Sequence, residues 1–474
     1  MLFGDYGMDI YMIGYYVQQA IYVIVGKILG CNYLIYAWLM LILGLIVSVI
    51  LSKYIVRKNR VLLMLVLGRK KMNYLISAYS VNPYHGSEDG VGWNWVLQYE
   101  KNFNPGDRII LLTKKYNEKD TRKGMKEFGI KHIELVIADV PNILNWFREK
   151  HSIFHHMYYI LWQHWAWLWV KKSGIKFDII HHVTMGDYRI TGEMYKCKDA
   201  RVIFGPVGGA QITPKSLKTY EKNKIVAKIR EIVNKSCDIN PFYREKINSF
   251  SSVVASNGET YQQIAAIRGE SRTKQIVELG LTDEYMNRSI KERTKKKIKI
   301  LYMGRLIEKK GILFLLDVVK QLKNKIEFEI DICGNGYLFD EIKHVLEEYS
   351  LDECVNMHGE IPHNQVIAYY QDADIFVLPS LRETGGTVLI EAMAYALPIV
   401  AFNTSFCTQL NEQNCGIFVN TNQELVGIKN DFCDALVKLS NDRALCKRLG
   451  KNGYRYVNDK LTWNEKYNRI VKNM

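Results

Sequence analysis

The stretch RETGGTVLIEAMAYALPIVA, residues 382–401, decides the fold of this chain. It follows a short apolar run, residues 374–380, and has the pattern of a strand, a glycine-bearing loop and a helix in succession. The helix is expected to begin near Thr387, where the first backbone N–H groups have no intrahelical partner. Gly385 and Gly386 allow a ligand to approach this backbone closely. The stretch therefore predicts an anion site at a helix start.

Two carboxylates flank this expected helix start. Glu383 lies before it, and Glu391, eight positions later, lies about one turn inside it. Carboxylate oxygens at these places can accept hydrogen bonds from the hydroxyls of a sugar or a ribose. The alternative interpretation is an ordinary helix start, at which the helix dipole favours acidic residues.

A second turn of the same kind, MGRLIEKKG, occupies residues 303–311. Arg305 and Lys310 follow the end of a predicted strand, and the carboxyl ends of parallel strands meet at one edge of a sheet. Two cations at that edge can hold a diphosphate. Two solvated loop charges are the alternative.

Around these turns the chain alternates short apolar runs with helical patterns, which is typical of parallel sheets built from βαβ units. Strands are predicted at residues 71–79, 108–113, 132–138, 177–183, 201–205, 252–256, 297–304, 327–334, 374–380, 398–402 and 416–419. The sequence predicts two doubly wound α/β domains, residues 72–286 and 297–455, that face a cleft. We expect residues 456–474 to form a helix that crosses back to the first domain.

Residues 33–51 carry no charge. At about 1.5 Å per residue they match the roughly 30 Å hydrocarbon core of a bilayer, and a buried globular helix rarely stays uncharged for so long. A basic run at residues 53–60 follows, which favours a cytoplasmic position for the rest of the chain. We therefore expect residues 1–60 to be an anchor in the cell membrane, with a transmembrane helix at about 33–52. Residues 8–29 are a second span or an interfacial helix.

The composition indicates which classes of binding partner and cofactor are to be expected. The net charge of +15 favours an acidic membrane face or phosphate-bearing substrates, and the basic residues form no stripe of the kind that binds nucleic acid. The nine cysteines contain no C-x-x-C pair, which suits a reducing compartment and argues against a zinc site. Asp372-Ala373-Asp374 spells a metal-binding D-x-D, but it ends a helix and opens a buried strand. No metal and no other cofactor are expected.

Together, the two turns resemble the retaining GT-B glycosyltransferases of family 4. Members of that family pair G-R-L-x-x-x-K-G with E-x-x-G-x-x-x-x-E-A-M-A-x-x-x-P some seventy residues later. This sequence supplies Gly304, Arg305, Leu306, Lys310 and Gly311, and then Glu383, Gly386, Glu391, Ala392, Met393, Ala394 and Pro398. The resemblance implies the GT-B fold, in which two Rossmann-like domains face a cleft.

The resemblance also implies roles for these residues. Arg305 and Lys310 would hold the donor diphosphate, Glu391 would contact the ribose, and Glu383 would contact the donor sugar near the reacting centre. The sequence departs from the family pattern at T-G-G, residues 384–386, where many members have G-F-G. This departure bears on which donor sugar fits. A second departure is Ala396, where glycine is usual.

The first half of the chain adds two loops, PYHGSEDGVGWNW and FGPVGGAQITP, that resemble the acceptor-side domain of the family. His181 and His182 end a predicted strand where members commonly place a histidine that contacts the donor sugar and the transition state. Because neighbouring strand residues point to opposite faces, at most one should be functional. A core histidine with a hydrogen-bond partner is the alternative. The loop glycines expected near donor or acceptor are Gly86, Gly90, Gly208 and Gly209.

The sequence thus predicts a retaining glycosyltransferase that uses a nucleotide sugar as co-substrate and a lipid-linked or polysaccharide acceptor in cell-surface glycan synthesis. Its other partners would be the membrane and further glycan-assembly enzymes. The predicted catalytic residues are His181, His182, Glu383, Arg305 and Lys310. The predicted donor-binding residues are Gly304, Arg305, Lys310, Gly385, Gly386, Thr387, Glu391, Gly86, Gly208 and Gly209. The alternatives are an inverting GT-B transferase of lipid-linked precursors and a non-catalytic nucleotide-sugar-binding membrane subunit.

Overall fold

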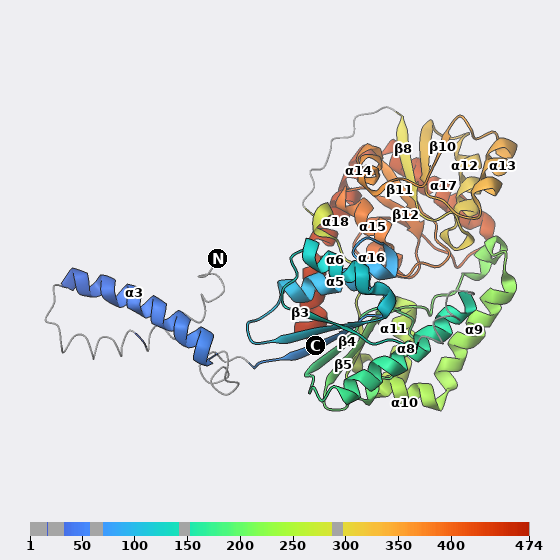
Figure 1. Cartoon of the computed structure of the whole chain (residues 1–474). Helices are drawn as coiled ribbons and strands as arrows, with labels where there is room; N and C mark the ends of the chain where they lie inside the picture. The colour runs from blue at the N-terminus through green and yellow to red at the C-terminus, as the bar shows by residue number, and fades with distance from the viewer. Residues whose placement is uncertain (1–16, 18–32, 57–69, 142–151, 287–296, 474) are drawn as a thin grey trace.

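Two parallel sheets organise the chain, each with helices on both faces (Figure 1). The computed structural model describes residue 17 and residues 33–56, 70–141, 152–286 and 297–473. The predicted α/β architecture with parallel sheets is confirmed.

The first sheet has seven strands in the order β3-β2-β1-β4-β5-β6-β7, and all neighbours pair parallel. The strands are β1 (Asn73–Ser77), β2 (Arg108–Thr113), β3 (Ile133–Ile137), β4 (Ile179–His182), β5 (Arg201–Val207), β6 (Ser252–Ala255) and β7 (Thr273–Gln275). Successive side chains of β1 enter different cores: Leu75 packs in one cluster and Ile76 in another. This alternation places apolar layers on both faces of the sheet.

The second sheet has six parallel strands in the order β10-β9-β8-β11-β12-β13. They are β8 (Ile298–Met303), β9 (Phe328–Cys333), β10 (Val355–Gly359), β11 (Ile375–Leu378), β12 (Ile399–Phe402) and β13 (Gly416–Val419). Their apolar side chains and the surrounding helices form one continuous core. The sheet reverses direction of growth between β8 and β11, and open sheets of this kind bind ligands at such a switch point.

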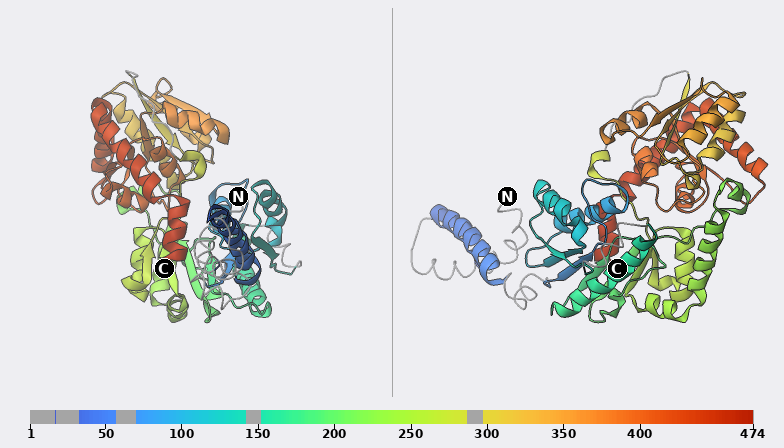
Figure 2. Two further views of the ribbon diagram at one scale, coloured as in Figure 1. Left: turned by 90° about the vertical axis from the view of Figure 1, so that its left-hand side faces the viewer. Right: turned by 45° about the vertical axis from the view of Figure 1, so that its right-hand side comes forward.

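Helices connect the strands and cover the sheets (Figures 1 and 2). Those of the first domain are α5 (Ser87–Lys101), α6 (Glu118–Glu127), α8 (Ser152–Lys172), α9 (Lys224–Ile239), α10 (Pro241–Ser249) and α11 (Gly258–Arg268). Those of the second domain are α12 (Ile312–Leu322), α13 (Phe339–Tyr349), α14 (His363–Asp372), α15 (Thr387–Ala394), α16 (Phe406–Glu412), α17 (Leu425–Asn441) and α18 (Arg443–Lys460).

The end of the chain returns to the first domain, and both views of Figure 2 show this passage. After α18, the short helix α19 (Trp463–Tyr467) packs on α5. The ring of Trp463 meets that of Trp95 edge-on with centroids 5.7 Å apart, and Tyr467 meets Tyr99 at 5.1 Å. Trp463 and Tyr467, together with Ile470 and Val471, are thereby part of the first domain's core.

The predicted anchor segment forms helix α3, Tyr33–Leu51, with side chains described from Ile42 onward. In the part of the chain that the structure describes, no helix is both long and apolar enough to cross a membrane. The predicted span therefore stays a prediction. The second apolar segment, residues 8–29, lies outside the described residues apart from Val17.

Candidate functional site

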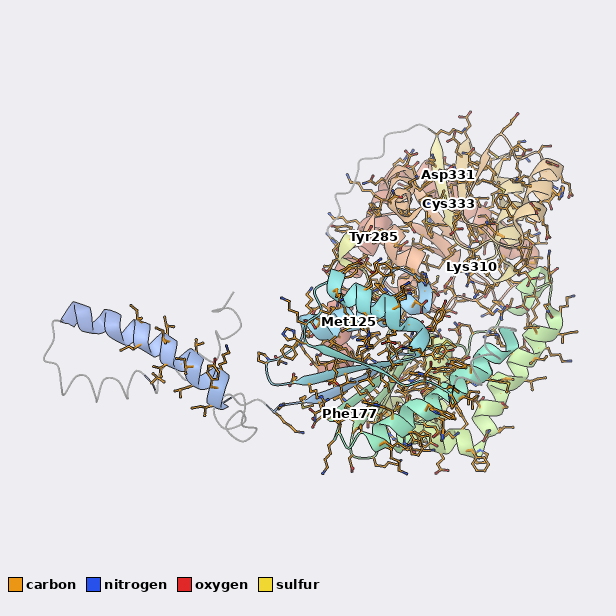
Figure 3. All side chains as sticks on the ribbon, viewed as in Figure 1. Met125, Phe177, Tyr285, Lys310, Asp331 and Cys333 are labelled. Carbon is orange, nitrogen blue, oxygen red and sulfur yellow. The ribbon has the colours of Figure 1, made fainter. Side chains whose placement is uncertain are left out.

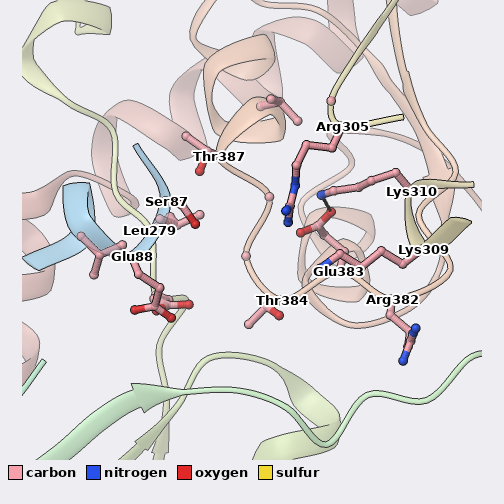
Figure 4. Close-up of a pocket in the computed structure, with 16 residues that line it drawn as sticks. Ser87, Glu88, Leu279, Arg305, Lys309, Lys310, Arg382, Glu383, Thr384 and Thr387 are labelled. Carbon is pink, nitrogen blue, oxygen red and sulfur yellow. Dashed lines mark hydrogen bonds and ion pairs between the residues drawn. The ribbon is translucent and has the colours of Figure 1, made fainter. Parts of the chain in front are cut away.

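A cleft of roughly 430 Å³ lies between the two domains. Figure 3 places Lys310 at this junction, and Figure 4 shows the wall residues. Loops that follow the carboxyl ends of strands line it, as expected for parallel sheets. The lining residues are Ser87, Glu88, Val91, Glu278, Leu279, Gly304, Arg305, Lys309, Lys310, Arg382, Glu383, Thr384, Gly385, Gly386, Thr387 and Val388.

The start of α15 presents unpaired backbone amides to this cleft. Gly386 precedes the helix in the left-handed conformation, with φ of 58°, and caps it without a side-chain hydrogen bond. The amides of Gly385, Gly386, Thr387 and Val388 have no acceptor among the described residues. Four consecutive free N–H groups at a helix start form a site for an anion. The structure thus places three predicted donor-binding residues, Gly385, Gly386 and Thr387, together on the cleft wall.

Lys310 and Glu383 form an ion pair in the same wall, with Nζ and Oε2 2.5 Å apart. Ser380 also donates its hydroxyl to Glu383, at 3.1 Å. Burial raises the pKa of the Glu383 carboxyl, but the charge and hydrogen bond of Lys310 outweigh it, so the net pKa lies below its ordinary value. Glu383 is therefore an ionised hydrogen-bond acceptor at neutral pH.

Further cations surround this pair. Arg305 and Lys309 line the cleft, and neither side chain has a hydrogen-bond or ion-pair partner among the described residues. Burial, then the like charges of Arg305 and Lys310, lower the pKa of Lys309 to about 8. Arg382 pairs at 3.6 Å with Glu221 of the first domain. Since Glu383 neutralises only one of these charges, the wall stays positive and suits a diphosphate.

Close backbone packing holds the two cationic loops together. Gly311 follows the β8 loop with φ of 70°, and a Cβ atom there would lie 1.8 Å from the carbonyl oxygen of Pro379. The amide of Leu381 donates to the carbonyl of Lys309 at 2.9 Å. Only glycine permits this approach, which explains why the G-R-L-x-x-x-K-G turn ends in glycine.

The opposite wall belongs to the first domain and is acidic. Glu88, in the first turn of α5, accepts hydrogen bonds from the amides of Met185 (3.0 Å) and Gly186 (3.4 Å). Glu278 exposes 9% of its surface, and its Oε1 has no hydrogen-bond partner. Burial raises the pKa of both carboxyls, that of Glu278 well above its usual range. The charge of Glu88 raises the pKa of Glu278 further, and the charges of Asp89 and Asp187 raise that of Glu88. One carboxyl of such a pair keeps its proton more readily than an isolated glutamic acid does.

A smaller cavity of roughly 160 Å³ adjoins this wall and shares Glu88, Glu278 and Thr384 with the main cleft. The predicted glycines Gly208 and Gly209 line it. A Cβ atom on Gly208 would lie 2.5 Å from Cγ2 of Thr384, so the two domains approach closely here.

Gly86 and Glu391 line neither cavity, and a third predicted residue, Gly304, lines the main cleft with its amide already bonded. Gly86 caps α5 in open space, where a Cβ would meet nothing within 4 Å. Glu391 lies in the second turn of α15 and accepts a 2.7 Å hydrogen bond from Tyr370. Gly304 lines the main cleft, but its amide already donates to the carbonyl of Cys333 at 3.0 Å. The predicted ribose contact of Glu391 therefore stays a prediction.

His181 and His182 are both buried in the core at the end of β4. His181 bonds the Tyr99 hydroxyl (3.2 Å) and the Gly205 carbonyl (2.9 Å) through its two ring nitrogens. His182 lies 3.0 Å from the Tyr159 hydroxyl. Burial lowers the pKa of His181 to about 3 and that of His182 to about 4, so both rings are neutral. This geometry matches the core alternative, and we leave both histidines out of the proposed site.

Comparisons with known proteins agree with this geometry. The family model described as glycosyl transferases group 1 matches residues 284–456. The second domain belongs to this family. The matched residues include Arg305, Lys310 and Glu383, which belong to the two predicted motifs.

Relatives and solved structures extend the comparison. The amylovoran biosynthesis glycosyltransferase AmsK of Erwinia amylovora is 32% identical over 146 residues, 29% of this chain and 36% of that protein. The putative colanic acid biosynthesis glycosyltransferase WcaL of Salmonella typhimurium is 33% identical over 111 residues, 22% of this chain and 27% of that protein. The matches thus span about a third of these relatives' lengths.

Among solved structures, the lipopolysaccharide outer core galactosyltransferase WaaB has a TM-score of 0.57 at 16% identity, covering 85% of this chain and 100% of WaaB. HepE of Anabaena in complex with UDP and glucose has a TM-score of 0.52 at 13% identity, covering 85% and 100%. At these identities the likeness concerns the fold alone. The chain has a GT-B-like fold.

Sequence reasoning missed four charged residues of the cleft: Lys309, Arg382, Glu88 and Glu278. Lys309 and Arg382 lie beside predicted residues in the quoted motifs, so the motifs themselves were a signal for them. Glu88 lies within a quoted loop of which only the glycines were selected. Glu278 follows β7, a strand that the sequence pattern did not reveal, so it had no local signal.

Proposed function

We propose that this protein is a glycosyltransferase that transfers a sugar from a nucleotide-sugar donor to a glycan acceptor during the synthesis of a bacterial surface polysaccharide. The observation that carries the proposal is the cleft wall of the group 1 domain, where cationic side chains and free amides converge on one space. The names of AmsK and WcaL, both polysaccharide biosynthesis glycosyltransferases, support it.

The donor diphosphate binds at the α15 start, between Arg305 and Lys310. In the transfer, the bond between the sugar C1 and the phosphate oxygen breaks, and its electron pair stays on the departing diphosphate. Fixed cations and backbone amides stabilise this growing charge without having to reorganise. Glu383 orients Lys310 and accepts a hydrogen bond from a donor-sugar hydroxyl, so its ionised state serves both contacts.

The acceptor binds against the acidic wall. The carboxyl groups of Glu88 and Glu278 face the same cleft and can exchange hydrogen bonds with acceptor hydroxyls. The unsatisfied Oε1 of Glu278 is available for such a bond. The acceptor oxygen then forms its bond to C1 as the diphosphate leaves, and the proton of the acceptor hydroxyl passes to the phosphate oxygen that kept the electron pair.

The resemblance to family 4 supports a retained anomeric configuration and a lipid-linked or polysaccharide acceptor, and both are part of the proposal. NMR of the product distinguishes a retaining from an inverting enzyme by its anomeric coupling. A purified chain that binds a nucleotide sugar without any turnover would instead be a non-catalytic subunit.

The uncharged run at residues 33–51, followed by a basic run, supports a membrane anchor with the two domains on its cytoplasmic side. If this proposal holds, the full chain stays with the membrane fraction after an alkaline carbonate wash. Release of the full chain by that wash would contradict it.

Nucleoside diphosphates test the donor site directly. UDP, GDP and ADP are added separately to the purified full chain, and the melting temperature is recorded. A ligand at 100 times its Kd stabilises the folded form by about 2.7 kcal/mol, so one of the three should raise the melting temperature by several degrees. The matching nucleosides, which lack the diphosphate, should not. Absence of a shift with all three diphosphates would refute the proposed site.

Lys309 predicts a pH dependence of this binding. Its pKa of about 8 in the free protein means that it loses its proton as the pH rises through 8. A bound diphosphate favours the protonated amine, so binding takes up a proton above this pH, and the affinity falls by up to roughly tenfold per pH unit. Titration calorimetry measures the affinity for the nucleoside diphosphate between pH 7 and pH 9, at intervals of about half a pH unit. In the Lys309→Arg variant the affinity should not change with pH over this range, because arginine stays protonated. An equal fall of affinity in the variant and in the unchanged protein would exclude Lys309 as the cause of the pH dependence.

A further inference from the structure

Helix α9 runs along the outside of the first domain (Figure 1), and it carries an exposed apolar face. Seven large apolar side chains of α9 and the start of α10 expose between 39% and 81% of their surface. They are Ile225, Val226, Ile229, Ile232, Val233, Ile239 and Phe242. Water contact of so many apolar groups on one short stretch is unfavourable, and such a surface marks an interaction site.

These side chains lie on one side of the helix. Ile225, Ile229 and Ile232 follow one another at intervals of four and three residues, the spacing of a single helix face. Asn234 and Cys237 lie on the opposite side and are buried against the domain. The apolar face is therefore the outward side of a helix that already packs on the first domain through its other side, and the apolar face does not contribute to this packing.

A row of lysines borders this face. Lys224, Lys228 and Lys235 are exposed and, at four- and seven-residue intervals, lie along one margin of the helix. Within the described ranges, none of the three has an ion-pair partner. Lysine stems can lie along an apolar surface while their ammonium groups reach the level of lipid phosphates.

The acidic residues of α9 lie beyond the lysine row and are already engaged. Glu231 pairs with Lys218 at 2.6 Å, and Asp238 accepts a 3.0 Å hydrogen bond from Gln263. Neither carboxylate opposes the approach of an anionic surface along the apolar face.

We propose that α9 and the start of α10 form a docking surface for an anionic membrane. The apolar side chains enter the boundary between headgroups and acyl chains, and the bordering lysines bind lipid phosphates. A protein partner fits less well, because lysine is depleted in protein–protein interfaces. This surface is separate from the predicted anchor at residues 33–52 and depends on no catalytic assignment. It would hold the first domain, with its acidic cleft wall, against the bilayer.

Hydrogen–deuterium exchange on the full chain tests the proposal, because it reports on α9 locally however residues 1–60 attach. The chain is placed in nanodiscs of phosphatidylcholine alone or of phosphatidylcholine with one third phosphatidylglycerol. Peptides that cover residues 224–246 should exchange at least roughly tenfold more slowly in the anionic nanodiscs. Peptides of α17, with its exposed Val426, should be unchanged.

Two variants and one matched control make the result specific. The triple change of Lys224, Lys228 and Lys235 to glutamine should remove the protection by phosphatidylglycerol. The matched control, with the exposed Lys447, Lys451 and Lys460 of α18 changed to glutamine, loses the same charge and should keep it. Ile229→Ser combined with Ile232→Ser should remove the protection in anionic nanodiscs without lowering the melting temperature, since both side chains are exposed.

Three results would overturn the proposal. Protection of α9 that is absent, or equal in both nanodiscs, excludes an anionic membrane as the partner. Loss of the protection of α9 in both the α9 triple variant and the α18 control would show that the net charge of the chain, and not the lysines of α9, causes the protection. Protection that rises with protein concentration without lipid would assign the face to a second copy of the chain.

Discussion

Replacing Lys310 by alanine should lower sugar transfer by about 100-fold or more and abolish the thermal shift with the nucleoside diphosphate. Loss of one preorganised group that stabilises a developing negative charge typically costs a factor of about 100 to 1,000 in rate. The change also leaves Glu383, which is 8% exposed, without its ion partner inside the anion site. Transfer is measured as labelled sugar incorporated into the lipid and polysaccharide fractions of membranes from source cells.

The loss of function has to be separated from a loss of folding, because removing one partner of a buried ion pair can cost about 3–5 kcal/mol. Lys310→Met combined with Glu383→Gln removes both charges, so its melting temperature should recover while transfer stays low. Lys297→Ala is the matched control: it removes a lysine whose 2.9 Å pair with Glu329 is exposed, and such pairs contribute about 0–1 kcal/mol. Full transfer by Lys310→Ala would remove this residue from the site.

Gly311→Ala should destabilise the second domain by about 3 kcal/mol or more and weaken donor binding. A left-handed conformation costs a non-glycine residue roughly 1–2 kcal/mol, and here the new Cβ would also meet the Pro379 carbonyl oxygen at 1.8 Å. Because that contact is with backbone, the loop after β11 has to move, and this loop leads to the amides at the start of α15. Thermal unfolding and the nucleoside diphosphate titration measure both effects.

Gly359→Ala provides the matched control for this change. Gly359 has φ of 67°, close to the 70° of Gly311, but a Cβ there would meet nothing within 4 Å. The control should therefore show only the conformational cost, about 1–2 kcal/mol, and unchanged nucleotide binding. Equal destabilisation in the two variants would show that the close approach to Pro379 contributes nothing.

The strands that sequence reasoning found and missed differ in burial. Central strands such as β8 and β11 are buried on both faces. Their sequences are therefore nearly continuous apolar runs, which can be recognised as strands from the local sequence alone. The edge strands β7 (Thr273–Gln275) and β10 (Val355–Gly359) are short and partly exposed. Their sequences, TKQ and VNMHG, carry no apolar run, and only pairing with a neighbouring strand makes them part of a sheet.

The candidate site divides in a similar way. Arg305, Lys310 and the Gly385–Gly386 loop could be predicted because each lies beside a strand end within a short motif, and parallel strands bring such ends to one edge. The residues of the opposite wall could not be predicted in this way. Glu88 and Glu278 are 190 positions apart in the chain and come from different loops, so no local pattern connects them.

The histidines show the limit of a motif at a strand end. Alternation predicted that His181 and His182 point to opposite faces, and they do enter different surroundings. Whether a face opens on a cleft or on a core depends on the helices that cover it. Tyr99 of α5 and Tyr159 of α8 cover both faces and bond both rings.

The sequence by itself determined two parallel α/β sheets and a cationic, glycine-bearing motif in the second half of the chain, because strand burial, helix starts and glycine turns are local properties. Only the tertiary structure decided that the cationic motif faces an acidic wall, that the histidines are core residues and that α9 presents an apolar face to the outside. The reason is physical: charge pairing, burial and exposure depend on which distant segments meet, and only the packed chain brings them together.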